Sequence, residues 1–215
     1  MKQAAIFDMD GTLFQTDLIL ELSLDDTFAH LRSLGAWDGV TPIDTYRHIM
    51  GVPLPEVWAA LLPDHAEDMK ELANSHFLKR LIDNIKNGRG ALYPNAKEIL
   101  VYLKEKGVAI FIASNGLPDY LAAISRYYGL DEWVTETCSI QQIQSLNKSD
   151  LVRMILKKYA IQTAVVVGDR LSDIQAAKEN GLLAIGCRFD FAKDDELVQA
   201  DWVIDDLLEI KSILM

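Results

Sequence analysis

Two carboxylates near the N-terminus stand where a buried strand is predicted to end. Asp8 follows directly on the apolar run 4–7, and Asp10 comes two residues later, just before Gly11. If the extended geometry continues, both side chains point the same way. Two like charges so close raise the pKa of one of them unless a cation neutralises them. A simple Asp-Gly turn would explain Asp10 but not Asp8.

A second pair of acids follows another apolar run, at 164–167. Asp169 again ends a predicted strand, and Asp173 lies four residues later, one helical turn away if a helix starts there. Capping of that helix by Asp173 or Ser172 would account for one acid but not for both. Because carboxylate oxygens are the ligands that Mg²⁺ prefers, the two acid pairs together predict a site for a hard cation.

Residues suited to an anion end a third apolar run, at 108–113. Ser114, Asn115 and Gly116 offer a hydroxyl, an amide and backbone N–H groups near a helix start, which is a natural cradle for an anion. Lys148 precedes a helical pattern, and taken alone it would be a solvated surface lysine. Three strands that bring acids, a hydroxyl and a lysine to one end of a sheet indicate phosphoryl transfer to an aspartate.

Short apolar runs alternate with amphipathic helical patterns over most of the chain. The predicted strands are 4–7, 108–113, 164–167, 182–185 and 202–204, and the predicted helices are 95–106, 117–128, 148–159 and 172–180. This alternation predicts an α/β fold with a Rossmann-like parallel sheet sandwiched by helices. Ligands of such sheets bind beyond the carboxyl ends of the strands, where the polar residues lie.

One segment interrupts the alternation. Residues 15–87 have helical periodicity and no convincing strand, and Gly88-Arg89-Gly90 then marks a return hinge. We therefore predict a core domain of residues 1–14 and 88–215, with an inserted α-helical cap domain of residues 15–87. An insert placed directly after the first acids is expected to act as a lid that closes over a substrate.

Length and composition bound the class of protein. The chain has 215 residues, of which half are apolar and a quarter charged, and its formal net charge is −11. The composition is that of a globular protein, and the acidic balance argues against a nucleic-acid partner. No run approaches the ~20 apolar residues of a membrane span. Cys138 and Cys187 form no metal or disulfide pattern, so a cytoplasmic location is expected.

Taken together, the motifs resemble those of the haloacid dehalogenase-like hydrolase superfamily. They occur in the family's order and cover the whole chain as Asp8-Met9-Asp10-Gly11-Thr12-Leu13, Ser114-Asn115-Gly116, Lys148, and Gly168-Asp169 with Asp173. The helical insert resembles the cap of the phosphoglycolate phosphatase and β-phosphoglucomutase branch. The segment 92–100, "LYPNAKEIL", resembles the stretch that leads out of that cap.

The resemblance implies roles for the four acids. Asp8 would be the nucleophile that forms an aspartyl-phosphate, and Asp10 would be the general acid and base. Mg²⁺ would be bound by Asp8, Asp169 and the backbone carbonyl of Asp10. Asp173 would support the metal directly or through water.

The resemblance also implies a phosphate-binding set. Ser114 and Lys148 would bind the phosphoryl oxygens, with help from the amides of Asn115 and Gly116. Lys148 would also offset the charge on Asp8. In the cap segment, Thr16 and the turn at Gly51-Val52 are candidates to face the leaving group, although a helix cap and a loop glycine would explain them equally well.

The expected activity is that of a Mg²⁺-dependent phosphatase acting on a small phosphorylated metabolite, with neither nucleic acid nor membrane as partner. A phosphomutase of the β-phosphoglucomutase type would keep every motif. A non-catalytic phosphate-binding protein would be expected to lack the nucleophile or the acid, and a haloalkanoic acid dehalogenase would need neither Asp10 nor Asp169. The motifs leave open the substrate, the oligomeric state, the cap residues that set specificity and the role of Arg170.

Overall fold

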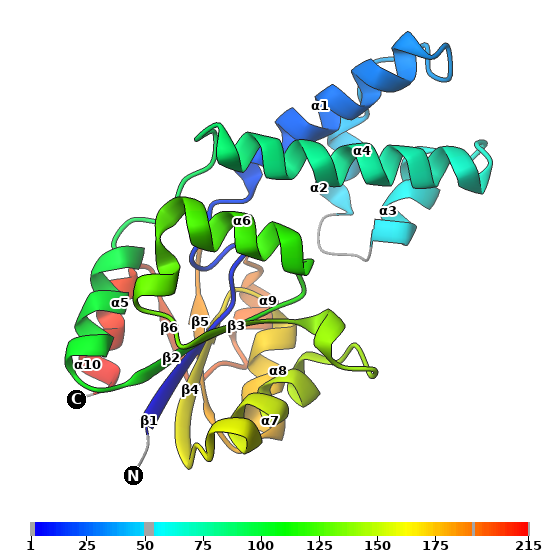
Figure 1. Cartoon of the computed structure of the whole chain (residues 1–215). Coiled ribbons are helices and arrows are strands. Elements are labelled where there is room, and N and C mark those ends of the chain that lie inside the picture. Colours follow the sequence, from blue (N-terminus) through cyan, green and yellow to red (C-terminus); the bar gives the residue numbers. More distant parts are fainter. Residues whose placement is uncertain (1–2, 50–53, 191, 215) are drawn as a thin grey trace. The chain divides into compact units, whose positions relative to one another are not determined.

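A six-stranded parallel sheet forms the centre of the fold, with the strand order β3-β2-β1-β4-β5-β6 (Figure 1). The computed structural model describes residues 3–49, 54–190 and 192–214. The strands are β1 (Gln3–Phe7), β2 (Ala109–Ser114), β3 (Glu136–Ser139), β4 (Thr163–Gly168), β5 (Leu183–Cys187) and β6 (Trp202–Ile204). The sheet confirms the predicted α/β class, and all five predicted strands are present.

The apolar runs did not predict β3. Its sequence, Glu-Thr-Cys-Ser, has only one apolar residue, and only Cys138 and Ser139 are buried. β3 lies at the edge of the sheet and pairs with β2 alone among the described strands. An edge strand is less completely covered than a central one, so it does not require a continuous apolar run.

Helices cover both faces of the sheet. In this part of the chain they are α5 (Ala96–Glu105), α6 (Pro118–Tyr128), α7 (Lys148–Tyr159), α8 (Leu171–Glu179), α9 (Asp194–Leu197) and α10 (Ile210–Ile213). Short 3₁₀ turns lie at Leu130–Glu132, Ile140–Gln142 and Leu207–Glu209. Val152 of α7, Ile174 of α8 and Leu197 of α9 share one apolar cluster with Ile6 and Val166 of the sheet. Helices α5 and α10 lie on the opposite face (Figure 1).

The register brings the carboxyl ends of the three central strands level with one another. Phe7 of β1 pairs with Ile112 of β2 on one side and with Val167 of β4 on the other. The strand order reverses between β1 and β4. In open parallel sheets the crevice at such a reversal is where ligands bind, so the fold itself marks the end of β1.

The chain divides into two compact units, Met1–Thr16 with Ala91–Met215, and Asp17–Gly90. The described part of the second unit is helical and comprises α1 (Asp17–Ser33), α2 (Ile43–His48), α3 (Leu54–Leu61) and α4 (Glu67–Lys86). Asn84 of α4 donates a buried hydrogen bond to Ser23 of α1 (2.9 Å), which joins the two longest helices. The turn at Gly51-Val52 lies outside the described residues. None of the described helices combines the length and apolar character needed to cross a membrane.

The two segments that lead to and from the helical unit pair with each other inside the core unit. Phe14 and Leu92 form an isolated antiparallel bridge. The Gln15 N–H donates to the Ala91 carbonyl (2.9 Å), and the Gln15 side chain donates to the Leu92 carbonyl (2.7 Å). The chain therefore leaves the core and returns to it at one point. The predicted domain boundaries and the predicted lid role of the insert stay predictions.

The end of α7 generates a test of stability. Ala160 follows this helix with φ of 50°, in the left-handed region, which costs an L side chain about 1 kcal/mol. Glycine pays no steric cost there but loses more backbone entropy on folding. We expect Ala160→Gly to raise the free energy of unfolding by roughly 0.5 kcal/mol. Urea denaturation followed by tryptophan fluorescence measures the change.

The reverse substitution provides the control. Gly129 ends α6 with φ of 70°, so Gly129→Ala should lower the free energy of unfolding by about 1 kcal/mol. If Ala160→Gly is neutral or destabilising while Gly129→Ala is harmless, then the left-handed geometry at these two helix ends contributes nothing to stability.

Candidate active site

The site begins at the end of β1. The Asp8 N–H extends the strand ladder by donating to the Val167 carbonyl (2.8 Å), so Asp8 lies at the edge of the sheet between β2 and β4. Its side chain is charged and yet only 8 % exposed, because strands flank it on both sides. A buried carboxylate requires a partner of opposite charge, since desolvation otherwise favours the protonated form.

Lys148 is that partner. It is the first residue of α7, whose N-cap Asn147 accepts a hydrogen bond from the Ser149 N–H (2.7 Å). The Lys148 ammonium lies 2.8 Å from Asp8 Oδ1 and 2.5 Å from Asp173 Oδ1. Although burial alone would lower it, the two carboxylates hold the pKa of Lys148 above its ordinary value. Lys148 is therefore a buried counter-charge and not the solvated lysine that the residue alone would suggest.

Asp169 completes a cluster of three buried carboxylates. Oxygen atoms of Asp8, Asp169 and Asp173 lie within 4.8 Å of one another. When all three are ionised, three negative charges face the single positive charge of Lys148, which leaves an excess of two. An all-oxygen donor set with two uncompensated negative charges fits a divalent cation such as Mg²⁺. The backbone carbonyl of Asp10 stays a predicted further ligand.

The pKa values of these acids are raised, as expected where negative charge is in excess. Burial raises the pKa of Asp8 from 3.8 to about 7; Lys148 opposes the rise, and Asp173 and Asp10 add to it. Burial also raises the pKa of Asp169 well above its ordinary value, and the charges of Asp8 and Asp173 raise it further. Both shifts disfavour the ionised form of these acids, and a bound cation would oppose the shifts and release any proton held there.

Two glycines leave the space in which the carboxylates lie. Gly11 has φ of 74°, and a Cβ added there would lie 2.7 Å from Cγ of Asp169. A Cβ on Gly168 would overlap the carboxyl group of Asp173. Gly11 is therefore required for both backbone conformation and space, and Gly168 for space alone.

The chain turns sharply after Asp8, so the condition that extended geometry continues through Asp10 is not met. The N–H groups of Leu13 and Phe14 both donate to the Met9 carbonyl, at 3.0 and 2.9 Å. A turn of this kind is what the Asp10-Gly11 pair favours, and it overrides the alternation that a strand would impose. Asp10 nevertheless stays near enough for its charge to raise the pKa of Asp8.

The carboxyl group of Asp10 has its own hydrogen-bond partners. Thr16 Oγ1 and Tyr120 OH both donate to Asp10 Oδ1, each at 2.5 Å. Burial raises the pKa of Asp10, and the two hydroxyls counteract that rise. Whether Thr16 faces a leaving group stays a prediction, but its hydroxyl is buried and directed at the proposed acid.

The end of β2 holds the hydroxyl predicted to bind an anion. Ser114 is buried, and its Oγ accepts a hydrogen bond from the Gly116 N–H (2.9 Å). Ser139, at the end of β3, donates to the Gly116 carbonyl (2.7 Å) and so fixes the same turn. Because Ser114 Oγ already accepts one hydrogen bond, its own hydrogen is directed elsewhere. Asn115, which lies between Ser114 and Gly116 in the chain, is exposed.

Asp173 is both a helix cap and a member of the acid cluster. Its Oδ2 accepts a hydrogen bond from the Arg170 N–H (3.1 Å) at the start of α8, and its Oδ1 faces Lys148. Arg170 itself points to Glu196 of α9, to which its Nε and Nη2 donate at 3.1 and 3.3 Å. Glu196 also accepts the Leu171 N–H (2.7 Å). The turn from Asp169 into α8, the helix that carries Asp173, is thus fixed from both sides.

Sequence reasoning did not identify three of these contacts. Thr12 Oγ1 donates to Asp169 Oδ1 (3.2 Å), Tyr120 binds Asp10, and Glu196 holds Arg170. Thr12 lies inside the first motif, so its position was a usable signal. Tyr120 and Glu196 lie on helices distant in sequence from their partners, and only the fold brings them together.

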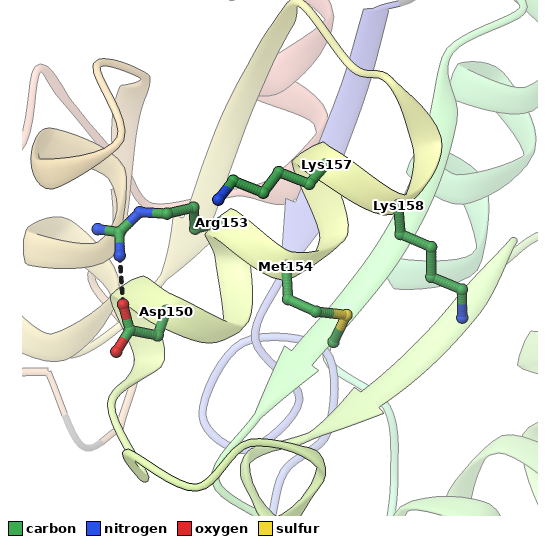
Figure 2. A pocket seen from close by; sticks show the side chains of 5 residues that line it. All are labelled: Asp150, Arg153, Met154, Lys157 and Lys158. Carbon is green, nitrogen blue, oxygen red and sulfur yellow. Dashed lines mark hydrogen bonds and ion pairs between the residues drawn. The ribbon is translucent and has the colours of Figure 1, made fainter.

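A shallow cavity on the outer side of α7 does not belong to this site. Figure 2 shows its lining, in which Arg153 forms an ion pair with Asp150. The lining residues are Asp150, Arg153, Met154, Lys157 and Lys158. Arg153, Lys157 and Lys158 are exposed, and Asp150 and Met154 are half-buried, on the helix whose first residue, Lys148, is buried among the acids.

The chain belongs to the haloacid dehalogenase-like hydrolase family, whose model matches residues 2–181. The family assignment confirms the resemblance stated from the motifs. The roles of the individual site residues stay predictions.

Relatives and solved structures show the same likeness over nearly the whole chain. A phosphoglycolate phosphatase of Pasteurella multocida (strain Pm70) is 26% identical, with 97% of this chain and 96% of the relative covered. The pyrophosphatase PpaX of Listeria monocytogenes serotype 4b is 22% identical, with 97% and 94% covered. A crystal structure described as a predicted phosphoglycolate phosphatase from Haemophilus somnus 129pt has a TM-score of 0.85 at 22% identity, covering 100% of this chain and 98% of that one.

The space left by Gly11 can be tested against a matched glycine. Gly11→Ala places a methyl group against Asp169, whereas Gly107 has a similar φ of 73° and open space around its Cβ position. Both substitutions should cost about 1 kcal/mol of backbone strain. We expect only Gly11→Ala to lose the stabilisation that added MgCl₂ gives, measured as the increase in melting temperature. An equal response of the two variants to MgCl₂ would contradict the proposed contact with Asp169.

Proposed function

We propose that this chain is a Mg²⁺-dependent phosphatase that hydrolyses a small phosphate monoester through an aspartyl-phosphate on Asp8. The observation that carries the proposal is the buried ion-paired chain from Asp8 through Lys148 to Asp173, with Asp169 beside it. A carboxylate next to a lysine and a cation site is suited to attack phosphorus, because the two positive charges reduce its repulsion from the negatively charged phosphate ester.

The first step transfers the phosphoryl group to the protein. An Asp8 oxygen forms a bond to phosphorus, and the bond from phosphorus to the ester oxygen breaks. Asp10 gives its proton to that departing oxygen, which leaves as an alcohol. Ser114 and Lys148 orient the phosphoryl oxygens in line for the transfer.

The second step regenerates the carboxylate. Asp10, now ionised, takes a proton from a water molecule as the water oxygen bonds to phosphorus. The bond between phosphorus and Asp8 breaks, inorganic phosphate leaves, and Asp10 holds its proton again. Lys148 stays paired with Asp8 before and after the cycle, so the nucleophile returns to the same position.

Mg²⁺ would be held by Asp8, Asp169 and the Asp10 carbonyl with support from Asp173, and when bound it neutralises negative charge on the phosphoryl group. The relatives support a small phosphorylated substrate of this kind. They are named for two different substrates, the ester phosphoglycolate and the anhydride pyrophosphate, so they support phosphate hydrolysis as a class more than any one substrate.

The direct test is a screen of phosphate esters run beside Asp8→Asn. The substitution keeps the shape of the side chain but removes the nucleophilic charge, so phosphate release should fall by about 10³-fold or more. EDTA should abolish release from the wild-type protein. Released phosphate is measured colorimetrically, and circular dichroism verifies that the variant folds.

Asp131→Asn is the matched control, because Asp131 is an exposed acid away from the site. It should leave turnover unchanged. Phosphate release that survives either Asp8→Asn or EDTA would refute the proposal. If no ester is hydrolysed, but a hexose phosphate is isomerised when a hexose 1,6-bisphosphate is added, the chain is a mutase.

Cation binding should depend on pH. Because the pKa of Asp8 is raised to about 7 and that of Asp169 is raised as well, these two sites bind more protons in the metal-free folded protein than in the unfolded chain above about pH 4. Their contribution to stability should therefore fall as pH rises from 4 towards 8, and Mg²⁺ should restore stability most at the alkaline end. Calorimetry should show Mg²⁺ binding more tightly at pH 8 than at pH 6, with proton release.

The control for this experiment is Asp169→Asn, which removes one of the two acids with a raised pKa. Proton release on Mg²⁺ addition should decrease in the variant, and the affinity should fall at both pH values. Mg²⁺ affinity that is equal at pH 6 and pH 8 in the wild-type protein would show that these acids are already ionised without the metal.

A further inference from the structure

Tyr120 reaches the proposed acid from a distant part of the chain. It lies in the first turn of α6, 110 residues after Asp10, and its side chain is buried with 6 % exposed. Its hydroxyl donates to Asp10 Oδ1 at 2.5 Å. A buried phenol needs a hydrogen-bond partner, and in a protein core that partner is commonly a backbone carbonyl. The partner of Tyr120 is instead the carboxyl group of the proposed acid, which points to a role in the site.

Two hydroxyls donate to the same oxygen of Asp10. Thr16 Oγ1 also lies 2.5 Å from Oδ1, so the two hydroxyls donate to the same carboxyl oxygen. A carboxyl oxygen has two lone pairs, so Tyr120 and Thr16 together use both lone pairs of Oδ1. The proton of the acid form is therefore carried by Oδ2. The two hydrogen bonds to Oδ1 hold the carboxyl group in place and so fix the direction in which Oδ2 points.

We propose that Tyr120 is a positioning residue for proton transfer, holding Asp10 Oδ1 so that Oδ2 exchanges the proton with the leaving group. This inference rests on the proposed function. As the bond from phosphorus to the ester oxygen breaks, the Oδ2 proton moves to that oxygen and negative charge develops on Asp10. Hydrogen bonds from Tyr120 and Thr16 become charge-assisted at that moment, so they stabilise the transition state more than the ground state.

The consequence is a dependence on the leaving group. An ester with a strongly basic leaving oxygen needs a proton from Asp10, whereas p-nitrophenolate leaves without one. Tyr120→Phe should therefore reduce kcat/KM for phenyl phosphate about 10-fold or more and for p-nitrophenyl phosphate by less than about 3-fold. The two probes have nearly the same shape, so a general loss of packing would slow both to the same extent.

A double-mutant cycle isolates the pathway through Asp10. Asp10→Asn should show the same preference for the better leaving group, and adding Tyr120→Phe to it should change little more, because the proton donor is already gone. Tyr127→Phe is the matched control, since Tyr127 lies on the same helix and is 48% exposed. It should leave both rates unchanged.

The result that overturns the inference is an equal effect of Tyr120→Phe on the two esters, or an undiminished effect in the Asp10→Asn background. If Tyr120→Phe fails to fold, Thr16→Val removes the other donor to Oδ1 and carries the same expectation, with Thr16→Ser as the variant that restores the rate. Loss of this pattern while Asp8→Asn stays inactive refutes only the role of Tyr120; activity of Asp8→Asn refutes the proposed function itself.

Discussion

Repulsion among three buried carboxylates is the constraint on which the rest of the site depends. Two unit charges within 4.8 Å of each other repel by at least about 3 kcal/mol at an effective dielectric constant of ~20, and ionised Asp8, Asp169 and Asp173 would form three such pairs. One ammonium, that of Lys148, offsets only part of this. The cluster is therefore unstable as an isolated set of ions, and it gains stability from whatever positive charge it binds.

The fold supplies the rigidity that such a cluster requires. The register of β1 with β2 and β4 fixes the position of Asp8, and the pairing of Glu196 with Arg170 fixes the turn from Asp169 into α8, which carries Asp173. Flexible side chains would separate to relieve the repulsion. Because strand ends and helix starts hold these carboxylates in place, they stay close together in spite of their repulsion.

Much of this arrangement was predictable from local patterns, and the remainder was not, for identifiable reasons. Apolar runs that end in Asp8, Ser114 and Asp169 located three strand ends at one edge, because a buried strand must be apolar throughout. The polar edge strand β3 lacks that signal, and the short helix α2 has too few turns to show a period. From the sequence, Tyr120 is only one residue of an amphipathic helix, because the neighbouring residues do not indicate that its hydroxyl contacts Asp10.

The antiparallel bridge between Phe14 and Leu92, with Gln15 bonded to Ala91, has an evolutionary consequence. The segments of the core unit on either side of the insert are hydrogen-bonded to each other, so this contact does not depend on which residues lie between them. Loop-closure entropy then hardly depends on the length of the spliced segment. A lineage with this junction can lengthen or shorten its insert while the sheet keeps its register, because the bridge between Phe14 and Leu92 does not depend on the residues that lie between them.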